Sequence, residues 1–405
     1  MKKAMQLALG ILTGVGGFLD VGNIATSAQA GAMFRFQLIW SLLLATLVVI
    51  FLTEMSGRFA AASKKALPDA IREHFGFSAW LPPFIILSIV HLLVLAAEIG
   101  GVCFALHLLT GLPIRLFALP VAILIWLFLW RATFSAIENS MSILGLITLC
   151  FVVAAIWHHP PAHEVLAGAL PSMPSHDPAR YWFIAVSIIG AVIAPFLFYF
   201  YSSGAIEDKW DRTYIPINRA IAVISMGFGS LISVSAIIVA AVVLAPRGIE
   251  ITDYHQAAML LTQAFPFWGY ALFAVSMGVA CLGAALEVAL SMSYTFAQTF
   301  GWNWGEDLQP IEDARFSMVY TVALLIGSLF MVVGVDPLKL TVVTMATNAF
   351  VMPFITIPFL LLMNDRKLLR DASNGVISNT ATVMIVILAL ILAVVSIPLT
   401  FLGKS

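Results

Sequence analysis

Charged residues are scarce in this sequence of 405 residues, in which Lys, Arg, Asp and Glu together make up 10%. A soluble domain carries about 25% charged residues, and the 61% of hydrophobic residues here leaves too little polar surface to cover a water-facing globule. Only three cysteines are present, all inside apolar runs and without metal-ligand spacing, so we interpret them as buried small hydrophobic residues rather than a disulfide scaffold. The composition therefore excludes a soluble enzyme, a nucleic-acid-binding protein and a disordered chain.

The sequence consists instead of apolar runs of roughly 20 residues, the length that an α-helix needs to cross a bilayer. The alternating ten-residue segments of a transmembrane β-barrel are absent. Runs bounded by charge, Pro or Gly predict about eleven spans, near 5–28, 37–56, 82–109, 115–131, 139–157, 181–204, 217–245, 265–298, 316–334, 338–363 and 377–402. The connections are short, so we predict an all-α polytopic membrane protein without a soluble domain.

The distribution of basic residues supports this number of spans. With a cytoplasmic N-terminus, fourteen of the 20 Lys and Arg residues fall on the cytoplasmic side and six on the other. Missing one span in the middle of the chain would remove this asymmetry. We therefore expect a cytoplasmic N-terminus, and the minimal loops favour the inner membrane of a bacterium. Nothing in the sequence fixes an oligomeric state, and a monomer is the simplest expectation.

The first thirty residues also admit a second interpretation as a cleaved signal peptide. Lys2 and Lys3 precede an apolar stretch, and Ala28–Ala30 has the A-x-A pattern of a cleavage site. Asp20 and Asn23 interrupt the apolar stretch, however, and the distance to the cleavage site is long. We therefore expect this segment to be retained as the first span.

Two predicted spans carry helix-breaking residues at their middles. Span 1 contains the glycine-rich stretch 14–17 followed by Asp20–Asn23, and span 6 contains Gly190–Phe196. Within the latter, Pro195 removes a helical hydrogen bond and crowds the carbonyl of Ala191. In a membrane, a broken helix is tolerated only where its backbone lines a protein-enclosed or wet cavity.

The two interrupted spans are the first members of two successive sets of five. We expect a first five-helix repeat over 1–157, a second, inverted repeat over 181–363, and an additional span over 377–402. Matching interruptions in two halves are the best indication in a sequence of a transporter site at the membrane midplane.

The candidate site residues supply oxygen atoms. A carboxylate such as Asp20 at mid-bilayer depth is costly and usually functional, although a protonated, hydrogen-bonded acid or a residue near the interface is the structural alternative. Asn23 adds a neutral oxygen, and an unwound helix adds carbonyls, so the set suits a cation. Glu98 and Glu287 are either more distant acids or helix–helix hydrogen-bonding partners, with a structural role favoured for Glu287. Asn348 in span 10 is a further, more distant candidate.

At these residues the sequence resembles the natural resistance-associated macrophage protein (Nramp) family. The resemblance rests on Phe18–Thr26 and Gln29–Ala32, on Arg72–Gly76, on Ala97–Glu98, on Pro353–Phe354 and on Pro358–Lys367. It implies divalent metal transport and a LeuT-type 5+5 inverted-repeat fold with broken helices 1 and 6. It also implies an ion site formed by Asp20, Asn23 and a backbone carbonyl near Ala191, with Ala194 at a position that lines the ion.

The sequence departs from the family pattern in ways that bear on the ion. Val21 replaces the proline of Asp-Pro-Gly-Asn, and Ala194-Pro195-Phe196 replaces Met-Pro-His. Leu95 stands where an Asp is expected, and the arginines expected in span 9 are missing, which removes groups of the family's proton route. Without the sulfur, an all-oxygen site suits Mg²⁺, Ca²⁺ or Mn²⁺. Ala194 makes room for a hydrated ion, because Mg²⁺ usually keeps several waters.

This pattern is similar to the Nramp-related magnesium transporter branch. We therefore predict a transporter of Mg²⁺, with Mn²⁺ also accepted, that works by alternating access without proton coupling and needs no cofactor. One alternative is a proton-coupled Mn²⁺/Fe²⁺ symporter that routes protons through Glu98 or Glu287. Another is an amino-acid or amine symporter on the same fold. An enzyme is not expected, because no nucleophile–base set is present.

Overall fold

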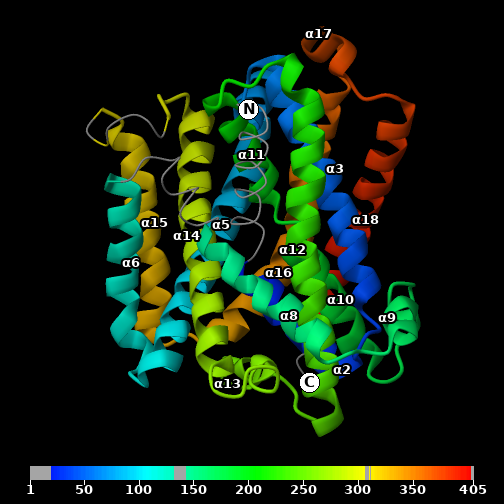
Figure 1. The fold of residues 1–405 in the computed structure, drawn as a ribbon. Coiled ribbons are helices and arrows are strands. Elements are labelled where there is room, and N and C mark those ends of the chain that lie inside the picture. Colours follow the sequence, from blue (N-terminus) through cyan, green and yellow to red (C-terminus); the bar gives the residue numbers. More distant parts are fainter. Residues whose placement is uncertain (1–19, 132–142, 306–309, 311, 403–405) are drawn as a thin grey trace.

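The computed structural model describes residues 20–131, 143–305, 310 and 312–402, and within these ranges every regular element is a helix (Figure 1). The helices are α2 (Val21–Phe34), α3 (Ile39–Ser63), α4 (Leu67–Phe75), α5 (Phe77–Thr110), α6 (Ile114–Arg131), α8 (Cys150–Trp157), α9 (Ala162–Gly168), α10 (Pro178–Val192), α11 (Pro195–Glu207), α12 (Ile215–Val243), α13 (Tyr254–Ala258), α14 (Gly269–Phe300), α15 (Ala314–Val333), α16 (Pro337–Met363), α17 (Arg366–Leu369) and α18 (Val376–Leu402).

The described part of the chain contains nine segments that are long and apolar enough to cross a membrane, with α10 and α11 together forming one of them. They correspond to nine of the eleven predicted spans. The remaining two, spans 1 and 5, are represented by α2 and by the shorter apolar helix Ile143–Trp157. The N-terminal parts of these two spans, 5–19 with its glycine-rich stretch and 139–142, lie outside the described residues. The prediction of an all-α polytopic membrane protein is confirmed.

The predicted start of span 3 at residue 82 is wrong by about one helical turn. Helix α5 begins at Phe77 and includes Pro82 and Pro83 in its interior. Its first turns are held by packing against the end of α14, where Trp80 is fully buried and its indole N–H donates to Thr299 Oγ1 at 2.8 Å. In a membrane helix such contacts offset the backbone hydrogen bonds that proline removes.

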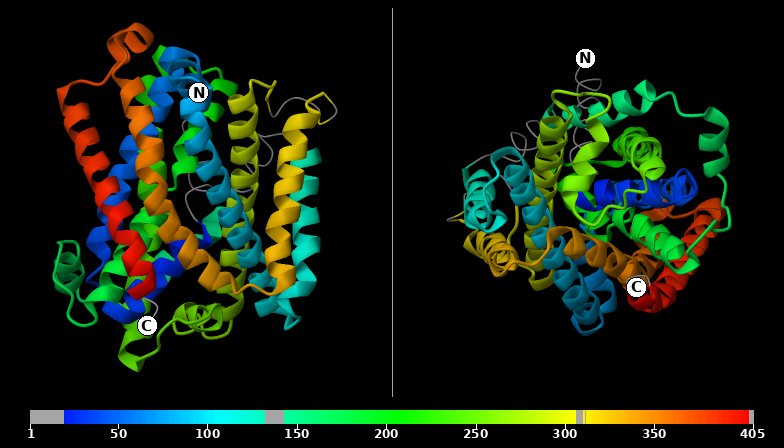
Figure 2. Two further views of the ribbon diagram at one scale, coloured as in Figure 1. Left: turned by 180° about the vertical axis from the view of Figure 1, so that it is seen from behind. Right: turned by 90° about the horizontal axis from the view of Figure 1, so that it is seen from below.

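The helix pair α10–α11 occupies the centre of the bundle. Of its most apolar window, 94% is buried, whereas the corresponding values are 22% for α6 and 28% for α18. Figure 2 shows α6 beside α15 at one edge of the molecule and α18 beside α16 at the other. The outer helices are therefore the ones that offer apolar surface to lipid, and the interrupted helices lie inside.

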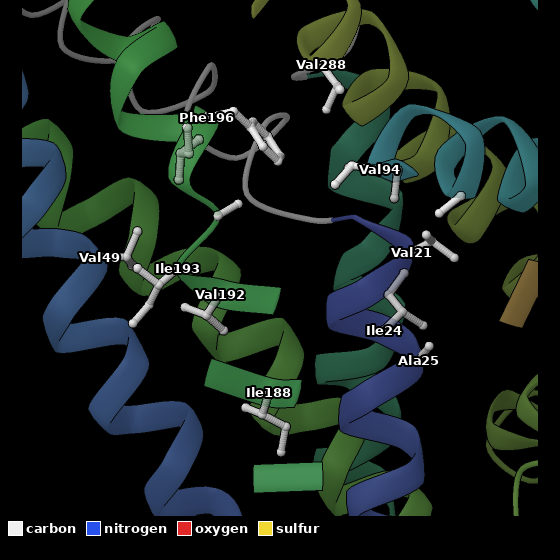
Figure 3. Close-up of a cluster of buried hydrophobic side chains, with 14 of the residues drawn as sticks. Val21, Ile24, Ala25, Val49, Val94, Ile188, Val192, Ile193, Phe196 and Val288 are labelled. Atoms are coloured by element: carbon white, nitrogen blue, oxygen red, sulfur yellow. The ribbon is translucent and has the colours of Figure 1, made fainter. Parts of the chain in front are cut away.

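The predicted interruption of span 6, and the Asp20–Asn23 part of that of span 1, fall where the described helices end or begin. Helix α10 ends at Val192, and α11 begins at Pro195 after the non-helical Ile193 and the extended Ala194. Proline is suited to the first position of a helix, where no N–H is needed. Helix α2 begins at Val21, after an extended residue 20 (φ −121°, ψ 174°). Figure 3 shows Val21, Ile193 and Phe196 within one buried apolar cluster.

Candidate metal-ion site

Asp20 is the N-cap of α2 and is only 7% exposed. Its Oδ1 accepts hydrogen bonds from the backbone N–H of Asn23 at 2.6 Å and from the side-chain Nδ2 of Asn23 at 3.0 Å. An N-cap side chain satisfies backbone donors that the first turn leaves open. The local sequence thus fixes the carboxylate at the point where the helix begins, inside the protein rather than facing lipid.

The C-terminus of α10 is the negative end of a helix dipole, whereas the start of α2 is a positive end. In an unbroken helix the carbonyl of Ala191 would accept from the N–H of residue 195. Pro195 has no N–H, so this carbonyl loses its helical partner at the C-terminus of α10. Ala191 is 2% exposed and Ala194 is 5% exposed. The break therefore provides a buried backbone oxygen next to a side chain of only one carbon.

Glu98 comes from α5 and is fully buried. Its Oε2 accepts from the backbone N–H of Val21 at 3.3 Å, so a second carboxyl group binds the first turn of α2. Apart from the thiol of Cys281, a weak donor, Oε1 has no hydrogen-bond partner among the described residues. The sequence left two roles open for Glu98, a more distant acid of the ion site or a helix–helix hydrogen-bonding partner. The hydrogen bond between α5 and α2 is present, and Oε1 does not take part in it.

Glu287 lies on α14 and is half-buried. Its charge interacts electrostatically with those of Asp20 and Glu98, which places the three carboxyl groups around one region of the bundle. An accumulation of buried acidic groups favours a cation there, because the negative charges otherwise repel one another.

Asn348 is fully buried on α16 and contacts the site from the side of α10. Its Nδ2 donates to the carbonyl oxygen of Gly190 at 3.3 Å, one residue before Ala191. Its Oδ1 has no hydrogen-bond partner in the described part of the chain. Asn348 therefore contacts the end of α10 directly, and its Oδ1 is a neutral oxygen.

Met345 is a residue of this region that the sequence did not single out. A methyl group added at Gly22 would lie 2.4 Å from Met345 Cε and 2.6 Å from its Sδ, so the side chain packs directly against the first turn of α2. The same sulfur lies 3.7 Å from Asn348 Nδ2. Met345 thus joins the α2 part of the site to the α10 part. Its spacing of three residues from Asn348 was the available signal, since both then lie on one face of a helix.

Both histidines of α5 make hydrogen bonds within the protein. His91 Nδ1 lies 2.8 Å from the carbonyl oxygen of Leu87 and Nε2 lies 3.0 Å from Ser291 Oγ, while His107 Nδ1 lies 2.7 Å from the carbonyl oxygen of Leu112. Across the described residues no group of three or more His, Cys, Asp or Glu side chains is arranged to hold a metal ion. A cation here would use carboxylate, amide and backbone oxygens together.

Comparison with known proteins gives matches over most of the chain. The sequence profile described as "Natural resistance-associated macrophage protein-like" matches residues 10–398. A Deinococcus radiodurans protein named divalent metal cation transporter MntH is 25% identical over 362 residues, which cover 87% of this chain and 80% of that protein. A protein of the same name from Xylella fastidiosa is 26% identical over 369 residues, covering 87% and 76%.

Solved structures resemble the fold. A crystal structure of the Eremococcus coleocola manganese transporter has a TM-score of 0.81 at 19% identity and covers 96% of this chain and 86% of that one. The inward-facing conformation of Mhp1 has a TM-score of 0.60 at 15% identity, covering 98% and 90%. At these identities the likeness shows the fold alone, and the fold is the LeuT type expected from the sequence. Because the family profile spans almost the whole length, the chain belongs to the natural resistance-associated macrophage protein (Nramp)-like family.

Proposed function

We propose that this protein moves divalent metal cations across a membrane by alternating access, with Mg²⁺ as the main substrate and Mn²⁺ also accepted. The observation that carries the proposal is the buried carboxylate of Asp20 at the start of α2. The next residue, Val21, belongs to the same apolar core as Val192, which ends α10 one residue after Ala191. Family membership supports cation transport, and similar proteins are named divalent metal cation transporters.

The donor atoms favour a hard cation. Asp20 supplies one formal charge, Asn23 and Asn348 supply amide oxygens, and Ala191 supplies a carbonyl. Oxygen ligands of this kind suit Mg²⁺ and Mn²⁺. The one-carbon side chain of Ala194 is smaller than the methionine of the family pattern, which favours an ion that retains part of its water shell, as Mg²⁺ does.

Uptake without proton coupling is the second part of the proposal. Leu95 is fully buried on α5 at the position where a titratable acid was expected, and it cannot carry a proton. The membrane potential supplies a driving force of about 2.3 kcal/mol per charge per 100 mV, so about 4.6 kcal/mol for a divalent ion. The alternative, a proton-coupled symporter, would route protons through Glu98 or Glu287. Among the described residues, Glu98 Oε1 has at most the thiol of Cys281 as a hydrogen-bond partner.

The orientation and the internal symmetry are also proposals. The distribution of basic residues supports a cytoplasmic N-terminus in a bacterial inner membrane. The start of α2 and the gap between α10 and α11 support two inverted repeats, 1–157 and 181–363, with 377–402 as an additional helix.

The test is Mg²⁺ uptake into proteoliposomes by the wild-type protein and by Asp20→Ala, read beside internal pH. We expect uptake without internal acidification, and we expect Asp20→Ala to abolish it. Asp336→Ala is the matched control, because Asp336 caps α16 through the backbone N–H groups of Leu338 and Lys339. Unchanged uptake by Asp20→Ala would remove this carboxylate from the site, and acidification coupled to uptake would favour the symporter.

A further inference from the structure

The thioether of Met345 packs against Gly22, in the turn that joins Asp20 to Asn23. We propose that Met345 supplies a soft sulfur donor from α16 and thereby sets how well Mn²⁺ competes with Mg²⁺. The inference rests on the proposed function, because it concerns the substrate preference of the same site.

The first observation is the contact between Met345 and the start of α2. Gly22 stands between Asp20 and Asn23 in the capping turn, and Cγ, Sδ and Cε of Met345 all lie within 3 Å of the place that a methyl group at Gly22 would occupy. Only a glycine leaves this space. The sulfur therefore reaches the turn that holds the carboxylate.

The second observation is the orientation of the sulfur. Asn348 Nδ2 lies 3.7 Å from Met345 Sδ and 3.3 Å from the carbonyl oxygen of Gly190. Asn348 thus ties the sulfur to the end of α10, where the carbonyl of Ala191 has lost its partner. Both side chains are fully buried, and Asn348 Oδ1 has no partner among the described residues. Met345 and Asn348 thus lie on one face of α16, one in contact with the start of α2 and the other with the end of α10.

The chemistry of a thioether explains the expected selectivity. A neutral sulfur is a soft ligand that contributes little to the binding of a hard ion such as Mg²⁺ and more to transition metals and Cd²⁺. A single sulfur among oxygen donors would therefore leave Mg²⁺ binding unaffected and raise the affinity for Mn²⁺ and Cd²⁺. This gives one site that accepts both Mg²⁺ and Mn²⁺.

The test compares Met345→Leu with Met352→Leu in proteoliposomes made with the full chain. Met352 is a buried methionine on the same helix, two turns further on, so its substitution is a control for packing. For Met345→Leu we expect the Mn²⁺ and Cd²⁺ concentrations that half-inhibit Mg²⁺ uptake to rise by about tenfold, a common effect of changing groups around a metal. The Mg²⁺ concentration for half-maximal uptake should stay unchanged.

Gly22→Ala is the second variant. Its methyl group would meet the flexible end of Met345 rather than backbone, so the thioether is displaced while the sulfur is kept in the protein. We expect the same shift in preference as for Met345→Leu. This variant keeps the inference testable if Met345→Leu does not fold.

X-ray absorption at the cadmium edge gives a direct readout. Cd²⁺ bound to the purified protein should show a Cd–S contribution that Met345→Leu removes. Cys281→Ser is measured in parallel, because its thiol lies beside Glu98 and is another sulfur in this part of the bundle. Loss of the Cd–S contribution in Cys281→Ser with retention in Met345→Leu would overturn the inference.

Two flux results would also overturn it. One is an unchanged Mn²⁺ to Mg²⁺ preference in Met345→Leu, and the other is an equal loss for all three ions, which would mean a packing role. Neither result affects the proposed function as long as Asp20→Ala abolishes Mg²⁺ uptake. Full uptake by Asp20→Ala would refute the proposed function independently of Met345.

Discussion

Gly190→Ala is expected to push α10 away from α16 and to reduce Mg²⁺ uptake, because the end of α10 is part of the proposed site. A methyl group at residue 190 would lie 2.0 Å from the carbonyl oxygen of Met345 and 3.1 Å from the backbone nitrogen of Ala349. Ordinary van der Waals contact begins at 3.4 Å, so the two helices must move apart by about 1.4 Å, because backbone atoms cannot turn aside as a side chain can.

The cost of this movement has two parts. Overpacking of a well-packed interior destabilises by about 1–3 kcal/mol. The hydrogen bond from Asn348 to the carbonyl of Gly190 is lost as well, which costs about 1 kcal/mol. We therefore expect the free energy of unfolding to fall by about 2–4 kcal/mol and Mg²⁺ uptake to be strongly reduced.

Thermal unfolding of the purified protein, followed by uptake assays, measures both effects. Gly204→Ala is the matched control, because Gly204 lies in α11 and a methyl group there would meet nothing within 4 Å. Alanine favours a helix over glycine by about 1 kcal/mol, so the control should be neutral or stabilised. Equal stability and uptake in the two variants would refute the close packing of α10 on α16.

Three further predictions follow from other parts of the structure. Ala194→Met places a thioether at the break between α10 and α11, and competition assays should show a higher preference for Mn²⁺ and Cd²⁺ over Mg²⁺. Arg58→Ala removes the side chain of a buried arginine, whose guanidinium donates to Glu54 and to oxygens of the loop before α18. It should lower stability by about 3 kcal/mol in a thermal unfolding assay, without rescue by lysine. Burial raises the pKa of Asp69 from 3.8 to about 6, against the opposing effect of Arg72. Its stabilising contribution is therefore present below pH 4 and lost as pH rises through about 6, and unfolding at pH 4 to 7.5 should show this slope reduced in Asp69→Asn.

The spans and the break between α10 and α11 could be predicted because they depend on local chemistry. Continuous apolar runs give the membrane helices, and the missing N–H of Pro195 gives the end of α10. Asp20 could be singled out as a candidate because a carboxylate inside an apolar run is costly and usually functional. The error at the start of α5 has the opposite cause, since packing of Trp80 on α14 keeps a helix that Pro82 alone would end.

Contacts between distant segments could not be predicted in the same way. The hydrogen bond from Val21 to Glu98 joins residues 77 positions apart, and the sequence left the role of Glu98 open. Met345 was overlooked because methionine is an ordinary residue of an apolar helix. Its position matters only because a glycine on another helix lets it approach.

The most direct test of the site is a diffraction experiment on crystals containing Mn²⁺, with data collected at the manganese absorption edge. We predict one anomalous peak between the carboxylate of Asp20 and the carbonyl of Ala191, at the start of α2 and the end of α10. The peak should be absent in Asp20→Ala crystals grown with the same ion. A peak elsewhere in the bundle, or an unchanged peak in the variant, would contradict the account.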